Sequence, residues 1–302
     1  MAKLLISFDG GGIRGAATGQ LVKLIHEELL KTEDKKLINY FDGVAGTSTG
    51  CLISTLMMSG YSGNDISEIY NQENAEAIFD SSIIDDTLGL LQHKPKYDGQ
   101  GKIKTIKEKV GEKRLRDIAT DDRLFVAIAY DVEKRVPFVW CSEDDSNPLL
   151  SDICDSSSAA PCYFPTIKTE SGQYLIDGGV VQNNPALTLY AKAKKKWPKE
   201  DIRILSIGTG YGNRGIDGEE SKDYGVISWM ANGLMSIFQD EHLVDDNLKD
   251  ILGDRFMRVN SPLKGVSDDM DCIEEENLQA LKDLGERWWN EFGPGIIDFI
   301  KG

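Results

Sequence analysis

Histidine and cysteine are both scarce in this chain of 302 residues. The three histidines are His26, His93 and His242, so a reaction that needs a histidine base has few candidates. The five cysteines are odd in number, scattered and without a Cys-x-x-Cys pair. Neither a disulfide framework nor a zinc site is therefore indicated, and we expect no metal and no cofactor.

Positive charge is also in short supply, because 34 lysines and arginines face 50 acidic residues and leave a net charge of −16. Such a balance opposes long-range attraction to nucleic acid and to strongly anionic membranes. Long apolar runs are missing as well. The segment from Tyr224 to Phe238 is too short and too broken by polar residues to span a bilayer, and either packs on the core or meets lipid.

Ser48 stands between two glycines, in Gly46-Thr47-Ser48-Thr49-Gly50, where an apolar strand-like run gives way to a helix-like run. This is the pattern of a nucleophile elbow, a turn so sharp that small residues are needed two positions either side of the serine. The hydroxyl would then lie at a helix N-terminus, where developing negative charge is stabilised. Because glycine is common, the motif alone is only suggestive.

A glycine-rich loop follows the strand-like Leu4 to Phe8 and precedes a helix-like stretch from Ala16 to about Leu30. Its glycines are Gly10, Gly11, Gly12 and Gly15, with Arg14 among them, and their spacing also fits the dinucleotide-binding pattern. That pattern requires an acidic residue at the end of the second strand, which here ends in Gly46-Thr47-Ser48. Three consecutive glycines favour instead a loop whose backbone N–H groups approach an anion closely, as in an oxyanion hole.

An acid turn, Asp177-Gly178-Gly179, ends the strand-like run from Tyr174 to Ile176. An Asp-Gly pair most often only caps a turn. A serine nucleophile, however, needs an adjacent base, and a carboxylate at a strand end can be that base. His242 is the rival base, because the order Ser48, Asp177, His242 is that of an α/β-hydrolase triad, although its surroundings indicate a helix or helix junction rather than a loop after a strand.

Four motifs occur in the order of one family. They are the loop from Asp9 to Gly15, the elbow from Gly46 to Gly50, Ala159-Ala160-Pro161, and the turn from Asp177 to Gly179. In these motifs the chain resembles a patatin-like phospholipase, and the resemblance extends over essentially the whole chain.

The resemblance implies a serine lipid acyl hydrolase with a Ser48–Asp177 dyad, an acyl-serine intermediate and no metal. Gly10, Gly11 and Gly12 would form the oxyanion hole, while Arg14 would add positive charge there or tie the loop structurally. The partner would be lipid at a membrane or micelle surface. Two alternatives remain: a lipid-binding or regulatory module of the same fold with little turnover, and an esterase or acyltransferase that uses His242.

The expected fold is α/β, a mostly parallel sheet between helices in a patatin-like three-layer arrangement. The strand-like runs are 4–8, 41–45, 124–130, 136–141, 174–176, 202–207 and 256–259. The hairpin formed by 124–130 and 136–141 is the only antiparallel element that we predict. We expect one domain over 1–302, with a core of about 1–212 and a C-terminal helical portion. Residues 80–101 are predicted to form a surface loop or a flap over the site.

The chain reaches its first predicted strand directly after Met1-Ala2-Lys3, which leaves no room for a secretory signal. A cytoplasmic location with peripheral membrane contact is therefore expected, and export by a signal-free route is the alternative.

Overall fold

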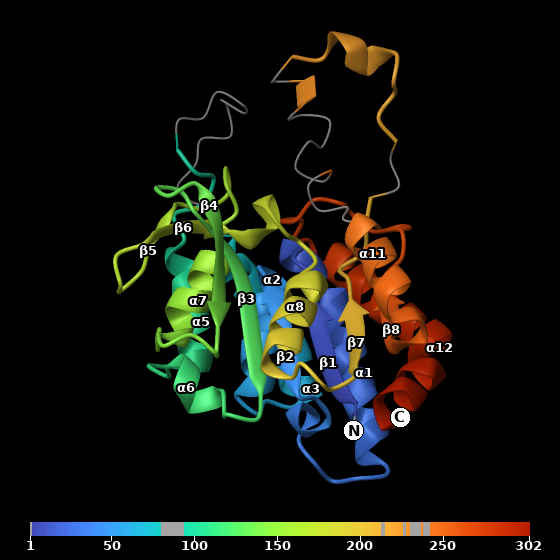
Figure 1. Ribbon diagram of the computed structural model, residues 1–302. Coiled ribbons are helices and arrows are strands. Elements are labelled where there is room, and N and C mark those ends of the chain that lie inside the picture. Colours follow the sequence, from blue (N-terminus) through green and yellow to red (C-terminus); the bar gives the residue numbers. More distant parts are fainter. Residues whose placement is uncertain (1, 80–93, 213–214, 226–227, 230–236, 238–241) are drawn as a thin grey trace.

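One mixed sheet of eight strands forms the centre of the computed structural model, which describes residues 2–79, 94–212, 215–225, 228–229, 237 and 242–302 (Figure 1). The strands are β1 (Lys3–Phe8), β2 (Gly43–Thr47), β3 (Leu124–Asp131), β4 (Val136–Cys141), β5 (Ile167–Lys168), β6 (Tyr174–Asp177), β7 (Ile202–Ile207) and β8 (Phe256–Val259). The α-helices are α1 (Gly15–Leu30), α2 (Thr49–Met58), α3 (Gly63–Glu68), α4 (Gln72–Ile78), α5 (Gln100–Val110), α6 (Leu115–Ile118), α7 (Leu150–Ser157), α8 (Ala186–Lys196), α11 (His242–Leu252) and α12 (Glu275–Lys301). Short 3₁₀ turns include η1 (Gly12–Arg14) and η4 (Gly178–Val180).

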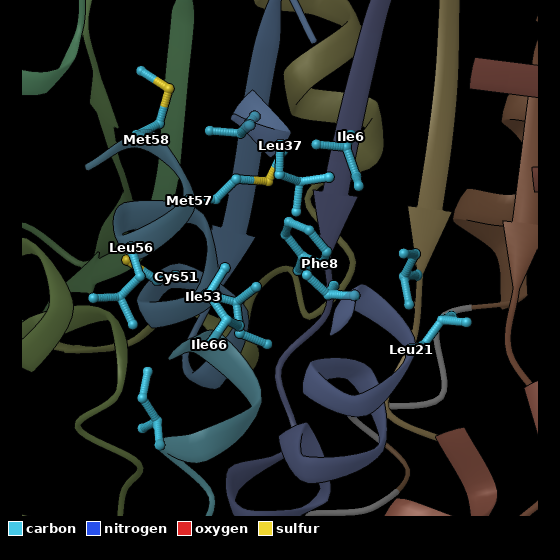
Figure 2. Close-up of a cluster of buried hydrophobic side chains, with 14 of the residues drawn as sticks. Ile6, Phe8, Leu21, Leu37, Cys51, Ile53, Leu56, Met57, Met58 and Ile66 are labelled. Atoms are coloured by element: carbon cyan, nitrogen blue, oxygen red, sulfur yellow. The ribbon is translucent and has the colours of Figure 1, made fainter. Parts of the chain in front are cut away.

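Alternation along the strands creates two buried layers, because successive side chains point to opposite faces of a sheet. In β1, Ile6 and Phe8 join a large core with α1, α2 and α12, part of which is drawn in Figure 2. Leu5, which precedes Ile6, joins a second core with α8 and α11 on the other face. The expected three-layer arrangement, with helices on both faces of the sheet, is therefore confirmed (Figure 1).

Most of the sheet is parallel, as predicted, since β8, β7, β1, β2 and β3 pair in that order and in one direction. The predicted hairpin is also present, with Asp131 of β3 opposite Val136 of β4. Strands β4, β7 and β8 have the predicted bounds, whereas β2 begins and ends two residues later than predicted. Its last two residues, Gly46 and Thr47, are less apolar than the run before them but still pair with β3.

The prediction that this hairpin is the only antiparallel element is wrong. Strand β6 runs antiparallel to β3, and β5, which was not predicted, runs antiparallel to β6. Strand β6 has four residues, too few for a sequence pattern that would indicate its direction. Its direction depends on the path of the chain from α7 back to β3.

The register places the ends of β2 and β6 against each other. Strand β4 pairs with residues 126–131 of β3 and therefore occupies most of one edge of that strand. The other edge is shared, because β2 pairs with residues 124–128 and β6 with residues 129–131. Thr47 lies opposite Ile128 and Asp177 opposite Ala129, so two segments 130 residues apart in sequence end at adjacent positions of the same strand.

Two sequence predictions fall wholly or partly outside the described residues. Residues 80–93 of the predicted loop or flap lie outside them, whereas 94–99 lead into α5. Most of the apolar segment from Tyr224 to Phe238 also lies outside them. Downstream, the C-terminal part of the chain adds β8 to the sheet and packs α12 against α1.

Candidate active site

Ser48 occupies the sharp turn between β2 and α2, with φ 55° and ψ −122°, a conformation that non-glycine residues rarely adopt. The flanking glycines are required by space. A Cβ on Gly46 would lie 2.1 Å from the carbonyl oxygen of Gly50, and one on Gly50 would lie 2.2 Å from that of Phe8. The backbone N–H of Ser48 donates to Ser157 Oγ at 3.0 Å. The predicted elbow geometry is thus present, and it is supported from α7.

Asp177 is brought to Ser48 by the shared edge of β3. The Ser48 hydroxyl lies close enough to the Asp177 carboxylate to lower its pKa, and the N–H of Gly179 donates to Asp177 Oδ1 at 2.6 Å. The carboxylate is buried, and burial raises its pKa from 3.8 to about 6. Hydrogen bonds from Gly179 and Ser48, and the positive charge of Lys102, limit that rise. At neutral pH this carboxylate is ionised, yet more basic than an exposed aspartate.

The glycine-rich loop lies directly beside the serine. A Cβ on Gly10 would be 3.2 Å from Ser48 Cβ and still closer to Asn183, so only glycine fits there. The N–H of Gly10 donates to the Asn183 carbonyl at 3.2 Å and is engaged within the protein. Within the described part of the chain, the N–H groups of Gly11 and Gly12 have no such partner. Gly12, at φ 57°, lines the same pocket as Ser48.

Two further distant segments hydrogen-bond to this loop. Thr209 Oγ1 donates to the carbonyl of Gly10 at 2.7 Å and fills the space in which Gly11 would carry a Cβ. The N–H of Ile13 donates to the Met270 carbonyl at 2.9 Å. These contacts fix the loop in the strand-to-helix junction between β1 and α1, where Gly15 packs too closely on Thr49 and Tyr70 for any side chain.

A buried charge network lies behind the loop. Arg258 of β8 donates through Nη1 to Asp9 at 3.0 Å and through Nε to Asp245 at 3.0 Å. Burial raises the pKa of Asp9, while Arg258 and, more weakly, Arg14 lower it. Arg14 is itself buried beside the loop. Asp9 belongs to a motif that carried the family resemblance, but its pairing with Arg258 across 249 residues was not predicted from sequence.

Neither of the two described histidines lines the pocket of Ser48 or hydrogen-bonds to Ser48 or Asp177. His242 is exposed at the start of α11, where its ring meets Tyr211 edge-on with the ring centroids 5.0 Å apart. His26 is buried in α1, where Nδ1 accepts the N–H of Gly63 at 2.9 Å. Among the described residues, no histidine contributes to the pKa of Asp177. His93, the third, lies outside the described residues.

An apolar pocket opens at Ser48. Its wall is formed largely by α2, α4, α5 and the segment after α7, with the side chains of Leu52, Ile69, Ile78, Phe79, Ile106 and Phe164. Lys102 of α5, a residue that sequence reasoning missed, also lies in this wall and is buried. Helix α5 has 11 residues and is rich in lysine, and nothing in its sequence marks Lys102 as the buried one. The pocket has the apolar lining that a hydrocarbon chain requires.

Two further features bear on how the site can work. Among the described residues, no group of three or more histidine, cysteine, aspartate or glutamate side chains is arranged to hold a metal ion. No described helix combines the length and the apolar character needed to cross a bilayer.

Comparison with known proteins agrees with the motifs. A family model described as patatin-like phospholipase matches residues 6–190. Patatin-like protein 1 of Oryza sativa subsp. indica is 30% identical over 338 residues, which cover 94% of this chain and 80% of that protein. Patatin group J-1 of Solanum tuberosum is 28% identical, with 93% and 82% covered. The crystal structure of VipD from Legionella pneumophila covers 96% of this chain and 67% of that one, at 11% identity and a TM-score of 0.49. The chain therefore belongs to the patatin-like phospholipase family.

Proposed function

We propose that this protein hydrolyses fatty-acyl esters of lipids, with Ser48 as nucleophile and Asp177 as its base. One observation carries the proposal: the hydroxyl of Ser48, held in a strained elbow that lines an apolar pocket, lies close enough to the buried Asp177 carboxylate to lower its pKa. Membership of a family named for phospholipase activity supports the same reaction class. The apolar wall beside Ser48 favours the acyl chain as the part of the substrate that is buried.

The first half of the proposed reaction forms an acyl-serine. Ser48 Oγ attacks the ester carbonyl carbon while its proton passes to Asp177, and the carbonyl oxygen becomes an oxyanion. The N–H groups of Gly11 and Gly12, together with the N-terminus of α2, can donate to that oxyanion. The ester C–O bond then breaks, and the leaving alcohol takes the proton from Asp177.

The second half releases the acid. Water attacks the acyl-serine and gives a proton to Asp177, and the bond to Ser48 Oγ breaks as that oxygen regains a proton from the same carboxylate. A pKa of about 6 suits both roles, because the carboxylate accepts a proton near neutral pH and returns it readily. An alcohol in place of water would give acyl transfer.

The test uses the purified chain with phosphatidylcholine vesicles and with triacylglycerol emulsions, each with a chelator present, and measures free fatty acid. We expect release by the wild type and a loss of roughly a thousandfold or more in Ser48→Ala and Asp177→Asn. His242→Ala is the matched control and should retain the wild-type rate. A comparable loss in His242→Ala would replace the dyad with a triad that includes histidine.

A second measurement separates hydrolysis from the alternatives. Wild-type protein that binds vesicles in flotation but releases no fatty acid from either lipid would support a lipid-binding module instead. Formation of a new ester when glycerol is supplied, at the expense of free fatty acid, would identify an acyltransferase. Labelling of Ser48 by a fluorophosphonate, detected by intact mass, reports the reactivity of the serine without any assumption about the lipid.

A further inference from the structure

Lys102 is a charged group buried in the wall of the pocket that Ser48 lines. Its ammonium lies 3.0 Å from Asp155 Oδ1 and donates to the carbonyl oxygen of Asp155 at 2.9 Å and to Ser158 Oγ at 3.2 Å. The ring of Phe164 lies on another side, with its centroid 4.5 Å from Nζ. These contacts engage the ammonium within the protein, so direct binding of an anionic ligand is not its role.

The residues that Lys102 holds form the C-terminal end of α7 and the segment after it. That short stretch also supports the backbone of both proposed catalytic residues. Ser157 Oγ accepts the N–H of Ser48 at 3.0 Å and donates to the carbonyl of Ile128 at 2.6 Å. The carbonyl of Ala159 accepts the N–H of Asp177 at 3.0 Å. A cation at this helix end also complements the helix dipole.

The charge of Lys102 acts on Asp177 as well. The groups that affect the Asp177 carboxylate are the N–H of Gly179, the hydroxyl of Ser48 and the ammonium of Lys102. The groups that affect Lys102 are Asp155, Asp177 and, more weakly, Cys154. Burial lowers the pKa of Lys102, and the two carboxylates oppose that change. Among the described residues, Lys102 is thus the cation that stabilises the ionised form of Asp177.

We propose that Lys102 is a positioning residue for the reaction: from α5 it fixes the end of α7 that supports Ser48 and Asp177, and it supplies the positive charge that keeps the Asp177 carboxylate ready to accept a proton. The proposal rests on the hydrolytic function proposed above. If Lys102 only stabilised the fold, it would hold α7 in place but would not change the protonation of Asp177.

The decisive experiment compares Lys102→Met with Lys102→Arg, and with Lys104→Met as the control for loss of an exposed lysine on the same helix. The rate of fluorophosphonate labelling of Ser48 and kcat/KM for a soluble acyl ester are measured from pH 4.5 to pH 9. We expect the acidic limb of the wild-type profile to have its midpoint near pH 6. Lys102→Met should move the midpoint upward by roughly half a unit to one unit, because a neighbouring positive charge is lost. Lys102→Arg and Lys104→Met should leave it in place.

Ser158→Ala distinguishes the effect of the hydrogen bond between Lys102 and Ser158 from the effect of the charge of Lys102. It removes one hydrogen bond to Lys102 but keeps the ammonium, so the rate should fall severalfold at every pH while the midpoint stays where it is in the wild type. An equal shift in Ser158→Ala and Lys102→Met would assign the effect to distortion of α7 and overturn the proposal. So would a profile of Lys102→Met that is lower throughout but has the wild-type midpoint.

A titration that needs no turnover keeps this test independent of the proposed function. Protein labelled with ¹³C at the aspartate side-chain carboxyl carbon is titrated by NMR, and the signal missing from Asp177→Asn is that of Asp177. An upward shift of its titration in Lys102→Met supports the role of Lys102 even if no ester is cleaved. Failure of Ser48 to react in the wild type would count against the hydrolytic function alone. If Lys102→Met does not fold, Lys102→Gln provides the same loss of charge with a polar side chain.

Discussion

Asp9 and Asp177 have the same local sequence, since each follows or ends a buried strand and precedes two glycines. Both carboxylates are buried, and burial raises the pKa of both. Their partners differ. Asp9 forms an ion pair with Arg258, whereas Asp177 accepts a hydrogen bond from the N–H of Gly179 and lies beside the hydroxyl of Ser48. The same tripeptide thus provides a structural ion pair in one place and the proposed base in the other.

The difference arises from segments that lie far away in the chain. Arg258 comes from β8, the last strand of the sheet, and it also holds Asp245 of α11. Asp9 is buried beside the glycine-rich loop, and the guanidinium of Arg258 compensates the charge of its carboxylate. Asp177 is left with a cation only at a distance, in Lys102, and so keeps a pKa at which it can exchange protons. Since burial raises the pKa of both acids, the group beside each carboxylate, an arginine at Asp9 and a serine hydroxyl at Asp177, decides which acid can act as the base.

The largest expected effect comes from breaking the Asp9 pair. Arg258→Met leaves the buried Asp9 and the half-buried Asp245 without their cation, and we expect the free energy of unfolding to fall by about 3 to 5 kcal/mol in chemical denaturation. Arg255→Met is the matched control, because Arg255 pairs with Asp201 at 2.8 Å on the exposed surface and should cost less than about 1 kcal/mol.

A second variant shows whether the charge is the cause. In the double variant Asp9→Asn with Arg258→Met, the buried carboxylate is removed together with the cation, so part of the lost stability should return. If Arg258→Met unfolds no more easily than Arg255→Met, the buried pair does not support the loop.

Asp177 should behave in the opposite way. Its folded pKa of about 6 exceeds the value of 3.8 of an unperturbed aspartate, so the folded state binds a proton more tightly than the unfolded state. Wild-type protein therefore loses stability as pH rises from about 4 to about 6, and Asp177→Asn does not. At pH 8 we expect Asp177→Asn to be more stable than wild type by up to about 3 kcal/mol, a difference that should vanish near pH 3.5.

Denaturant unfolding of both proteins across this pH range provides the measurement. Asp9→Asn is the comparison. Burial raises the pKa of Asp9 too, but Asp9 is an ion-pair partner of Arg258, and its removal leaves that guanidinium with Asp245 alone, so we expect stability to fall rather than rise. A loss of stability in Asp177→Asn at pH 8 would mean that the ionised carboxylate is well accommodated and that its pKa is not raised.

Sequence reasoning succeeded where the requirement is local. The glycines around Ser48 follow from the geometry of one turn, and the bounds of β4, β7 and β8 follow from short apolar runs between breaks. It could not show that β6 pairs antiparallel with β3, because the contact joins two short segments and depends on the path of the chain between them.

The same limit applies to the site. The N–H of Gly10 is engaged by the carbonyl of Asn183, 173 residues away, so the three glycines of the loop are not equivalent donors although their sequence is uniform. Lys102 lies near other lysines of α5 that face solvent, and only tertiary packing distinguishes it. Residues whose function depends on a partner elsewhere in the chain leave no local pattern.

The smallest expected effect concerns the support of Ser48 from α7. Ser157→Ala removes the acceptor of the Ser48 N–H, and because a typical hydrogen bond contributes about 1 kcal/mol, we expect a loss of roughly fivefold in the rate of Ser48 labelling. Ser156→Ala is the matched control: it removes the acceptor of Trp140 Nε1, a bond of 3.2 Å between side chains away from the elbow. Both variants should lose similar stability, but only Ser157→Ala should lose reactivity. Equal reactivity in the two variants would show that the strained turn is held by its glycines and its strand alone, and that α7 has no part in presenting the nucleophile.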